Sequence, residues 1–384
     1  MPPIEYAKNE NHYVITVDFK PDNPGHAVAD EYHNLSTRDH EGVLHLAREK
    51  RIDGIVAYAS DPAAPTAAFV AEELGLPGNP YEAVSTLADK KKFRDFLQAH
   101  GFNSPKCEVF SDVREAGAFL SEIPGDAFVK PADSSGSKGV TRLKERTAFA
   151  EAFFQAAEFS PTERVVIEEE IPRSGYQIDA DAFVVDGDLR FCCWSNQHVD
   201  ANCSGNVPAG ISFPSTLTAQ KQAHAEKETQ RLLDAIGFRN GALNIELVFT
   251  DTGELYFLEV GPRNGGNLIP EVTRYATGVD MIKYTVDAAL GRDCSDLENR
   301  PVSGFWSSYI IHSRRPGRFR ELRVSSLLEE KIVEWDPWVA AGDRVNAFQG
   351  AHHTLGTSIL RFSDMEEMLS LMDDMESHIE VCTD

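Results

Sequence analysis

The sequence predicts a chain that combines α/β and α+β architecture, on three observations. Strand-like and helical segments alternate from residue 13 to residue 75, which is typical of a parallel βαβ sheet. Short strands joined by glycine-containing turns then predominate, which is typical of antiparallel hairpins. Residues 301–384 hold several further strands and a final helix, DMEEMLSLMDDMESHI. A chain of 384 residues is long enough for two or three domains, each with its own core.

The first part is predicted to be a parallel sheet that lacks an opening unit. The β-rich runs YVITVDF (13–19) and DGIVAYAS (53–60) flank the helical pattern TRDHEGVLHLAREKR, and the helical pattern AAPTAAFVAEELG follows and stops at Gly75. The opening PPIEYAKNENH is typical of a helix end, where such a sheet usually begins with a strand and a glycine turn. We therefore expect an uncovered sheet edge through which the chain forms a homodimer or aggregates.

The remaining elements follow from capping, periodicity and turn signals. Residues 85–101 are predicted to form one capped amphipathic helix that ends at Gly101. The elements expected after it are a strand at KCEVF, a helix at 112–121, a strand–loop–strand over DAFVKPADSSGSKGVTRL, a helix at 146–158, a strand at RVVIEEEI, a hairpin over YQIDADAFVVDGDLRFCCWS, a helix at 219–237, a second hairpin, and a helix from about 269 to 290.

Composition excludes several classes of partner. The net charge of −24 argues against nucleic acid and against anionic membrane surfaces, because both attract basic patches. No apolar run approaches the ~18 residues of a membrane span. The six cysteines show no C-x-x-C spacing, which indicates reduced thiols rather than a disulfide frame or a zinc site. We therefore expect a cytoplasmic protein whose partners are small molecules.

The second hairpin, LNIELVFTDTGELYFLEVGPRNGGN (243–267), places two acids face to face. If Thr250 pairs with Leu255 across a four-residue loop, Glu246 lies directly opposite Glu259. Like charges opposed across a sheet are destabilising unless something lies between them. A divalent cation solves this, since Mg²⁺ takes oxygen ligands and bridges one or two carboxylates to substrate phosphates. The alternative is a surface hairpin with two solvated acids.

The same parity brings more polar groups to this face. Asn244 lies on the Glu246 face, opposite Gly261, and Arg263 follows two residues later. A guanidinium beside a metal suits a phosphoryl group in transfer.

Lysines and a glycine loop are suited to phosphate. The loop Asp133–Gly139 offers backbone N–H groups, hydroxyls and a lysine, although it is not a Walker A loop. Lys130 ends an apolar strand just before this loop, where an anionic partner would offset its desolvation. Lys90, in the ADKKK run, is a second candidate. The alternatives are a solvated turn, a snorkelling lysine and an ordinary solvated helix face.

Three consecutive acids, Glu168 to Glu170, end the strand RVVI and point to both faces of a sheet. They are consistent either with an edge strand blunted by charge or with a hinge that hydrogen-bonds a nucleotide base and ribose.

In this order, the lysine-bearing helix, FVKP with its Gly/Ser loop, the acidic hinge EEEI and the hairpin NIEL…GELYFLEVGPRNGG resemble the ATP-grasp superfamily over nearly the whole chain. The resemblance is greatest to its carboxylate–amine ligases and biotin-carboxylase-like members. It implies an incomplete, Rossmann-like N-terminal domain (1–85), an ATP-grasp nucleotide- and metal-binding domain (86–292) and a C-terminal α+β subdomain (293–384). ATP would lie between two antiparallel sheets.

The resemblance also assigns roles to residues. Glu246 and Glu259 would bind Mg²⁺ or Mn²⁺, and Arg263 would hold substrate carboxylate or phosphoryl oxygens. The residues expected around ATP are Lys90 and Lys130 at the phosphates, Ser134, Ser135, Gly136, Ser137, Lys138 and Gly139 in the loop over them, and Glu168, Glu169 and Ile171 at the adenine.

Two positions depart from the family pattern. Gly261 stands where family members commonly have a metal-binding Asn, so Asn264, Asn267 or water would substitute for it. Gln177 stands where a ribose-binding Glu is often found, and its carboxamide still hydrogen-bonds a ribose.

The resulting functional hypothesis is a ligase that uses ATP and Mg²⁺ to join a carboxylic acid to an amine, amino acids among the candidates, through an acyl phosphate. The alternatives are a biotin-carboxylase-like enzyme that activates bicarbonate and a non-catalytic ATP-binding protein. The sequence contains several candidates for the residues that bind the second substrate. These candidates are Asn267, Arg314 and Arg315, followed by Trp194, Asn196, His198, His312, His352 and His353.

Overall fold

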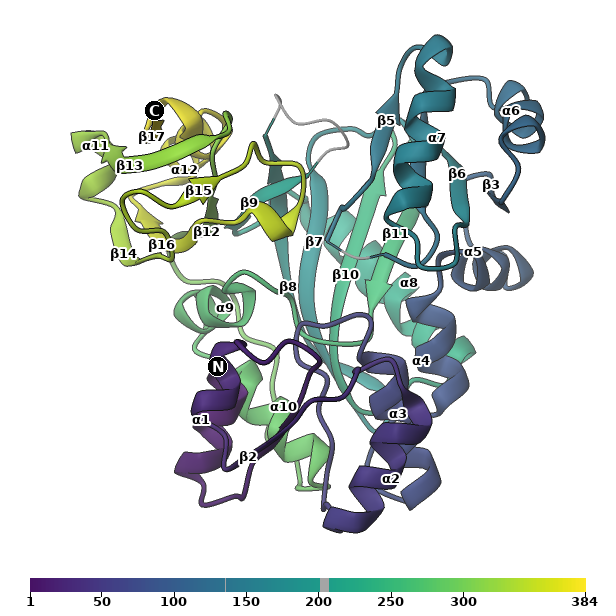
Figure 1. Cartoon of the computed structure of the whole chain (residues 1–384), viewed down its shortest axis with the longest axis vertical. Helices are drawn as coiled ribbons and strands as arrows, with labels where there is room; N and C mark the ends of the chain where they lie inside the picture. Colours follow the sequence, from purple (N-terminus) through teal and green to yellow (C-terminus); the bar gives the residue numbers. More distant parts are fainter. Residues whose placement is uncertain (135, 201–206) are drawn as a thin grey trace.

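The computed structural model describes residues 1–134, 136–200 and 207–384. An antiparallel eight-stranded sheet runs through the centre of the molecule, in the order β11-β10-β7-β8-β9-β12-β16-β14 (Figure 1). Its strands are β7 (Gln177–Val185), β8 (Asp188–Val199), β9 (Pro208–Phe213), β10 (Gly241–Phe249), β11 (Leu255–Gly261), β12 (Phe305–Ile311), β14 (Ile332–Pro337) and β16 (Gly356–Phe362).

The alternating residues of β7 show how this sheet is built. Ile178, Ala180 and Ala182 point to one face and join a core that also includes Leu232 and Leu233 of helix α8 (Ala219–Ile236). The opposite face is polar at the start of the strand and becomes apolar at Phe183, which packs in a second core with residues of α9 (Ile269–Thr277) and α10 (Met281–Ala289). Two helices therefore cover one end of this face, and its polar end is left for a site.

A smaller antiparallel sheet stands beside the polar end. Its order is β3-β6-β4-β5, with β3 (Cys107–Phe110), β4 (Ala127–Pro131), β5 (Thr141–Leu143) and β6 (Val165–Glu169). Helices α6 (Val113–Ser121) and α7 (Phe149–Glu158) bury an apolar face against it, and a 3₁₀ turn, η2 (Arg146–Ala148), precedes α7. The strand–loop–strand prediction for 126–143 is confirmed.

The N-terminal part contains a parallel sheet of only two short strands. The elements are α1 (Pro2–Asn9), β1 (Ile15–Val17), η1 (Pro24–Ala27), β2 (Glu31–His33), α2 (His40–Lys50) and α3 (Ala64–Leu74). The strand expected at 53–60 was wrong: this segment forms no strand in the described chain. It packs instead against α10, so closely that a Cβ at Gly54 would clash with the carbonyl oxygen of Ala289.

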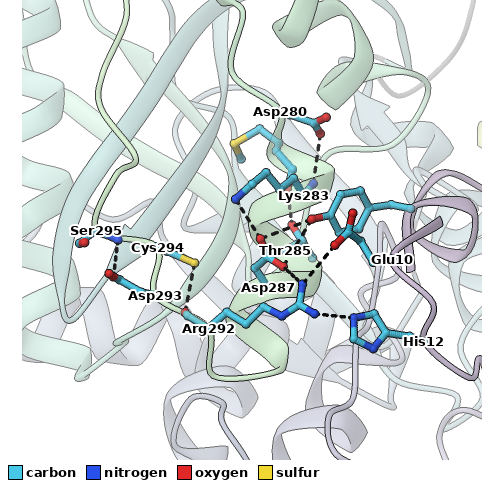
Figure 2. A network of polar contacts seen from close by, with 12 residues as sticks. Glu10, His12, Asp280, Lys283, Thr285, Asp287, Arg292, Asp293, Cys294 and Ser295 are labelled. Carbon is cyan, nitrogen blue, oxygen red and sulfur yellow. Dashed lines mark hydrogen bonds and ion pairs between the residues drawn. The ribbon is translucent and has the colours of Figure 1, made fainter. Parts of the chain in front are cut away.

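A polar network attaches α1 to α10 (Figure 2). Asp287 is buried, and its two carboxylate oxygens accept from Lys283 Nζ and Arg292 Nη1, each at 2.9 Å. Arg292 Nη2 lies 2.8 Å from His12 Nε2, and the Tyr6 hydroxyl approaches Asp287 at 3.4 Å. The N-terminal part is therefore joined to the helices that cover the central sheet.

Two helices expected to be continuous are broken. The 85–101 prediction was wrong because Asp89 adopts an extended conformation and its side chain caps Lys92, so that α4 (Tyr81–Ala88) ends and α5 (Lys90–Ala99) begins there. The 269–290 prediction was wrong because Gly278, with φ of 77°, ends α9 before α10 starts.

The C-terminal part extends the central sheet. Strands β12, β14 and β16 belong to it, so the sheet crosses the boundary predicted at residue 292. A three-stranded sheet, β15-β13-β17, packs beside it with α12 (Met365–Asp373). Its strands are β13 (Gly317–Val324), β15 (Arg344–Val345) and β17 (Ile379–Thr383), and the shorter helical elements are α11 (Ser326–Glu329), η3 (Ala351–His353) and η4 (Met375–Ser377). No helix among the described residues has the length and apolar character that a membrane crossing requires.

Candidate nucleotide and metal site

A cleft of about 880 Å³ lies between the two antiparallel sheets. Most of the predicted site residues line it, namely Lys90, Lys130, Ser134, Gly136, Ser137, Lys138, Glu168, Glu169, Ile171, Gln177, Glu246, Glu259, Arg263 and Asn267. Gly139, Arg314 and Arg315 are not part of the lining, and Ser135 lies outside the described residues. Residues that were predicted separately from local sequence patterns on both sheets therefore lie around one cleft.

Glu246 and Glu259 face each other on β10 and β11. The predicted turn was wrong, because Phe249, not Thr250, pairs with Leu255; a bulge after Glu246 absorbs the shift and leaves the two glutamates opposite. Burial and the neighbouring charge of Glu259 raise the pKa of Glu246 to about 8. Gln177 Nε2 donates to Glu246 Oε2 at 2.7 Å.

These carboxylates suit Mg²⁺ that is shared with phosphates. Protein sites for this ion commonly supply only one or two carboxylates. In the described ranges, no group of three or more His, Cys, Asp or Glu side chains forms an all-protein metal site. Burial and the charges of Glu259 and Asp179 raise the pKa of Glu246 although Arg263 and Lys130 oppose this, and a bound divalent ion would favour the charged carboxylate.

Glu168 lies between two cations. Its carboxylate accepts from Arg94 Nε at 2.9 Å and from Lys130 Nζ at 2.6 Å, and its side chain is only 3% exposed. Burial by itself raises the pKa of Glu168, but Arg94 and Lys130 overcome this and lower it to about 2. Strand β6 lies between β3 and β4, so the edge-strand alternative for these acids was wrong. Internal pairing already uses the Glu168 carboxylate, which leaves the backbone of the hinge for a base.

We expect Glu168→Gln to lower the free energy of unfolding by ~3–5 kcal/mol, because it leaves the buried Arg94 and the partly buried Lys130 uncompensated. The pKa is lowered in the folded state, so this contribution is present above pH 4.5 and is lost as the pH falls toward about 2. Urea unfolding at pH 7 and pH 3 measures it, with Glu158→Gln, at an exposed position of α7, as the control. A loss below ~1 kcal/mol at pH 7 would contradict a stabilising buried triad.

The phosphate-loop candidate is held from two sides. Lys90 Nζ donates to the carbonyl oxygen of Ser134 at 3.2 Å. The backbone N–H of Ala351 donates to the carbonyl oxygen of Gly136 at 3.1 Å. Gly139 has a φ of 69°, and a Cβ there would lie 2.7 Å from the Phe159 ring, so this position requires glycine. The C-terminal part thus contacts the loop directly and brings His352 to the cleft wall.

Replacing Lys130 with Met is expected to weaken nucleotide binding more than Lys91→Met. Lys130 lines the cleft beside the loop, whereas Lys91 lies on α5 and pairs with Asp95 at 2.5 Å. Calorimetric titration with MgADP compares the two variants. Equal affinities would make Lys130 only a partner of Glu168.

Arg263 is held by residues from distant parts of the chain. Its Nε and Nη2 donate to the two oxygens of Asp61 at 2.6 and 2.9 Å, and its Nη1 donates to Asn244 Oδ1 at 3.0 Å. Burial opposes the guanidinium charge, but Asp61 outweighs this and raises the pKa of Arg263. No sequence pattern indicated Asp61, which lies 202 residues before its partner.

Two further acids, Asp179 and Asp181, were missed. They lie fully buried on the cleft face of β7, and Asn244 Nδ2 contacts both, at 3.1 Å to Asp179 and 3.3 Å to Asp181. Burial is the main cause that raises the pKa of each to about 7, and for Asp179 the charge of Asp181 adds to it. The alternation in QIDADAF, which puts both acids on one face of an apolar strand, was the available signal.

Two second-substrate candidates, Arg314 and His312, have acidic partners within the protein. Arg314 pairs with Glu376 and approaches Asp200 at 3.9 Å, and His312 Nε2 lies 2.8 Å from Asp200. Of the substrate candidates, Arg263, Asn267 and His352 line the cleft.

His198 resembles a catalytic histidine only superficially. It lies between Ser212 Oγ and Asp373 Oδ1, both at 2.8 Å. Ser212 is completely buried, so a substrate cannot reach its hydroxyl. The arrangement ties α12 to β8 and β9.

The sequence profile of the ATP-grasp domain family matches residues 87–267, which contain both glutamates and the loop. The chain carries an ATP-grasp domain. The fold agrees: the L-amino acid ligase of Bacillus licheniformis superposes with a TM-score of 0.80, over 100% of this chain and 95% of that one, at 20% identity.

Two other proteins extend the comparison. The biotin carboxylase domain of the Hydrogenobacter thermophilus 2-oxoglutarate carboxylase, solved with MgADP, ADP and bicarbonate, gives a TM-score of 0.73 at 16% identity, over 99% of this chain and 87% of that one. The carbamoyl phosphate synthase large chain of Thermoanaerobacter sp. is 26% identical over 272 residues, which cover 69% of this chain and 24% of that protein. This chain thus spans about a quarter of that relative. The expected ATP-grasp fold is confirmed.

Proposed function

We propose that this protein is an ATP- and Mg²⁺-dependent ligase that joins a carboxylic acid to an amine through an acyl phosphate. The observation that carries the proposal is the pair Glu246 and Glu259, face to face in a cleft that also contains Lys130 and Arg263. A carboxylate is a poor acyl donor, and transfer of the γ-phosphoryl group to it creates a good leaving group.

The chain's own residues have three tasks in this reaction. Lys130 and Lys90 bind phosphate oxygens, and the loop from Ser134 to Gly139 encloses them with backbone N–H groups. Glu246 and Glu259 hold Mg²⁺, which neutralises charge during phosphoryl transfer. Arg263 donates to an oxygen of the acid or of the phosphoryl group as charge develops.

The bond changes balance without a protein nucleophile. A carboxylate oxygen attacks the γ-phosphorus and ADP leaves. The amine then attacks the acyl carbon, and inorganic phosphate departs with the carboxylate oxygen. This accords with the buried state of Ser212, the one serine that contacts a His–Asp pair in the described residues.

The similar structures leave two branches to compare. One is named an L-amino acid ligase, which supports amino acids as acid and amine. Another is a biotin carboxylase domain with bicarbonate, which supports bicarbonate activation as the second candidate. The ligase is the first candidate because the L-amino acid ligase superposes with the higher TM-score, 0.80 against 0.73 for the biotin carboxylase domain.

A panel of acids and amines tests the proposal, with ADP release and product mass as readouts. We expect ADP release that depends on a specific organic acid, and an amide product only when an amine is added. Bicarbonate-dependent ADP release that requires biotin would move the protein to the carboxylase branch. MgATP binding without ADP release across the whole panel would indicate a non-catalytic binding protein.

A further inference from the structure

The Arg263 guanidinium is almost fully engaged within the protein. A guanidinium has five N–H donors. The Nε N–H and one N–H of Nη2 donate to the two carboxylate oxygens of Asp61. Nη1 donates to Asn244 Oδ1 and, at 3.1 Å, to the carbonyl oxygen of Asn264. One N–H of Nη2 is left without a partner in the described chain. Arg263 therefore offers the cleft a single donor rather than a two-pronged grip.

The pair formed by Asp61 and Arg263 lies directly above Gly261. A Cβ at Gly261 would lie 2.9 Å from Arg263 Cζ and 3.1 Å from Asp61 Oδ1. The pair therefore occupies the space of the side chain that this position lacks. The departure from the family pattern at Gly261 and the presence of Asp61 are thus two parts of one arrangement.

The segment that carries Asp61 is shaped for this contact. Ala59, two residues before Asp61, has a φ of 50°, an unfavourable conformation for a residue with a Cβ. Ser60, Asp61 and Pro62 all line the cleft, and the side chain of Asp61 is 23% exposed. The N-terminal part thus contributes directly to the wall of the site.

We propose that Asp61 is a positioning residue: it fixes the Arg263 guanidinium over Gly261 so that one N–H of Nη2 meets the oxygen on which charge develops. This inference rests on the proposed function. A bidentate carboxylate is what makes the orientation fixed, because two parallel hydrogen bonds prevent rotation of the guanidinium plane. Asp61 acts through Arg263 and needs no contact with substrate.

Two variants test the proposal by different routes. Asp61→Asn removes the bidentate acceptor, and Gly261→Ala inserts a Cβ into the space of the pair. Displacement of a catalytic group by about 1 Å costs up to ~10²-fold in rate, so each variant should lower kcat for acid-dependent ADP release by roughly 10- to 100-fold. The KM for ATP should stay unchanged. Asp22→Asn, which removes the same charge from the exposed N-terminal surface, should match wild type.

Combination with Arg263→Met separates positioning from a merely structural ion pair. If Asp61 acts through Arg263, Asp61→Asn has no further effect on kcat in the Arg263→Met background. Equal losses in both backgrounds, or an unchanged kcat in Asp61→Asn and Gly261→Ala, would overturn the inference. If Asp61→Asn fails to fold, Gly261→Ala decides alone.

Two different outcomes separate the proposed function from the role of Asp61. No acid-dependent ADP release by wild-type protein, with any acid, refutes the proposed function. An active wild type with fully active Asp61→Asn and Gly261→Ala variants refutes only the role of Asp61.

Discussion

Glu246→Gln and Glu259→Gln should each lower kcat by ~10³-fold or more, because Mg²⁺ contributes several kcal/mol to phosphoryl transfer and ~1.4 kcal/mol corresponds to a factor of ten. The two carboxylates face each other across β10 and β11, and loss of either leaves one oxygen ligand group in place of two. ADP release at saturating acid and Mg²⁺ measures the effect. Glu254→Gln, in the exposed turn of the same hairpin, is the matched control.

Glu246→Gln should also stabilise the metal-free protein. The pKa of Glu246 is raised to about 8 in the folded state, so folding becomes less favourable as the pH rises from about 4.5 toward 8. Glu246→Gln removes this penalty, and its gain in unfolding free energy should be larger at pH 8 than at pH 5. Near-normal ADP release by both variants would remove the metal assignment.

Arg263→Met should lower kcat by ~10²–10³-fold, the usual cost of removing one donor that meets developing charge. Its effect on the KM for ATP should be small, since Lys90, Lys130 and the loop hold the nucleotide. Single-turnover ADP formation measures the step. Arg274→Met, on an exposed part of α9, is the control for loss of an arginine.

A second outcome would assign Arg263 a different role. The side chain is 12% exposed and joins Asp61 to Asn244, so its loss also leaves a partly buried carboxylate unpaired. If Arg263→Met lost stability but kept its kcat, the arginine would hold the two parts of the chain together without acting on the substrate.

Local patterns predicted the parts of the site that lie on single elements. The opposition of Glu246 and Glu259 was predicted from a turn that is one residue off, and it holds because the bulge after Glu246 restores the register. The glycine loop after Lys130 has its own composition signal. The alternation of Asp179 and Asp181 in QIDADAF was also a local signal, although most other residues of β7 are apolar.

Features that depend on tertiary contacts were beyond the sequence. Asp61 meets Arg263 only because the fold brings residues 202 positions apart together. Residues 53–60 have strong β-propensity but no partner strand, and they pack on α10. Helix periodicity runs through Asp89 and Gly278, where a cap and a left-handed glycine end helices that the pattern alone continues.

The most direct test of the acyl-phosphate route follows an oxygen atom. When a carboxylic acid labelled with ¹⁸O in both oxygens is the active acid, one labelled oxygen should appear in the inorganic phosphate for each amide formed, because that oxygen bridges carbon and phosphorus in the intermediate. Glu246→Gln should release neither product at a measurable rate. Unlabelled phosphate, or AMP and pyrophosphate in place of ADP and phosphate, would contradict the account.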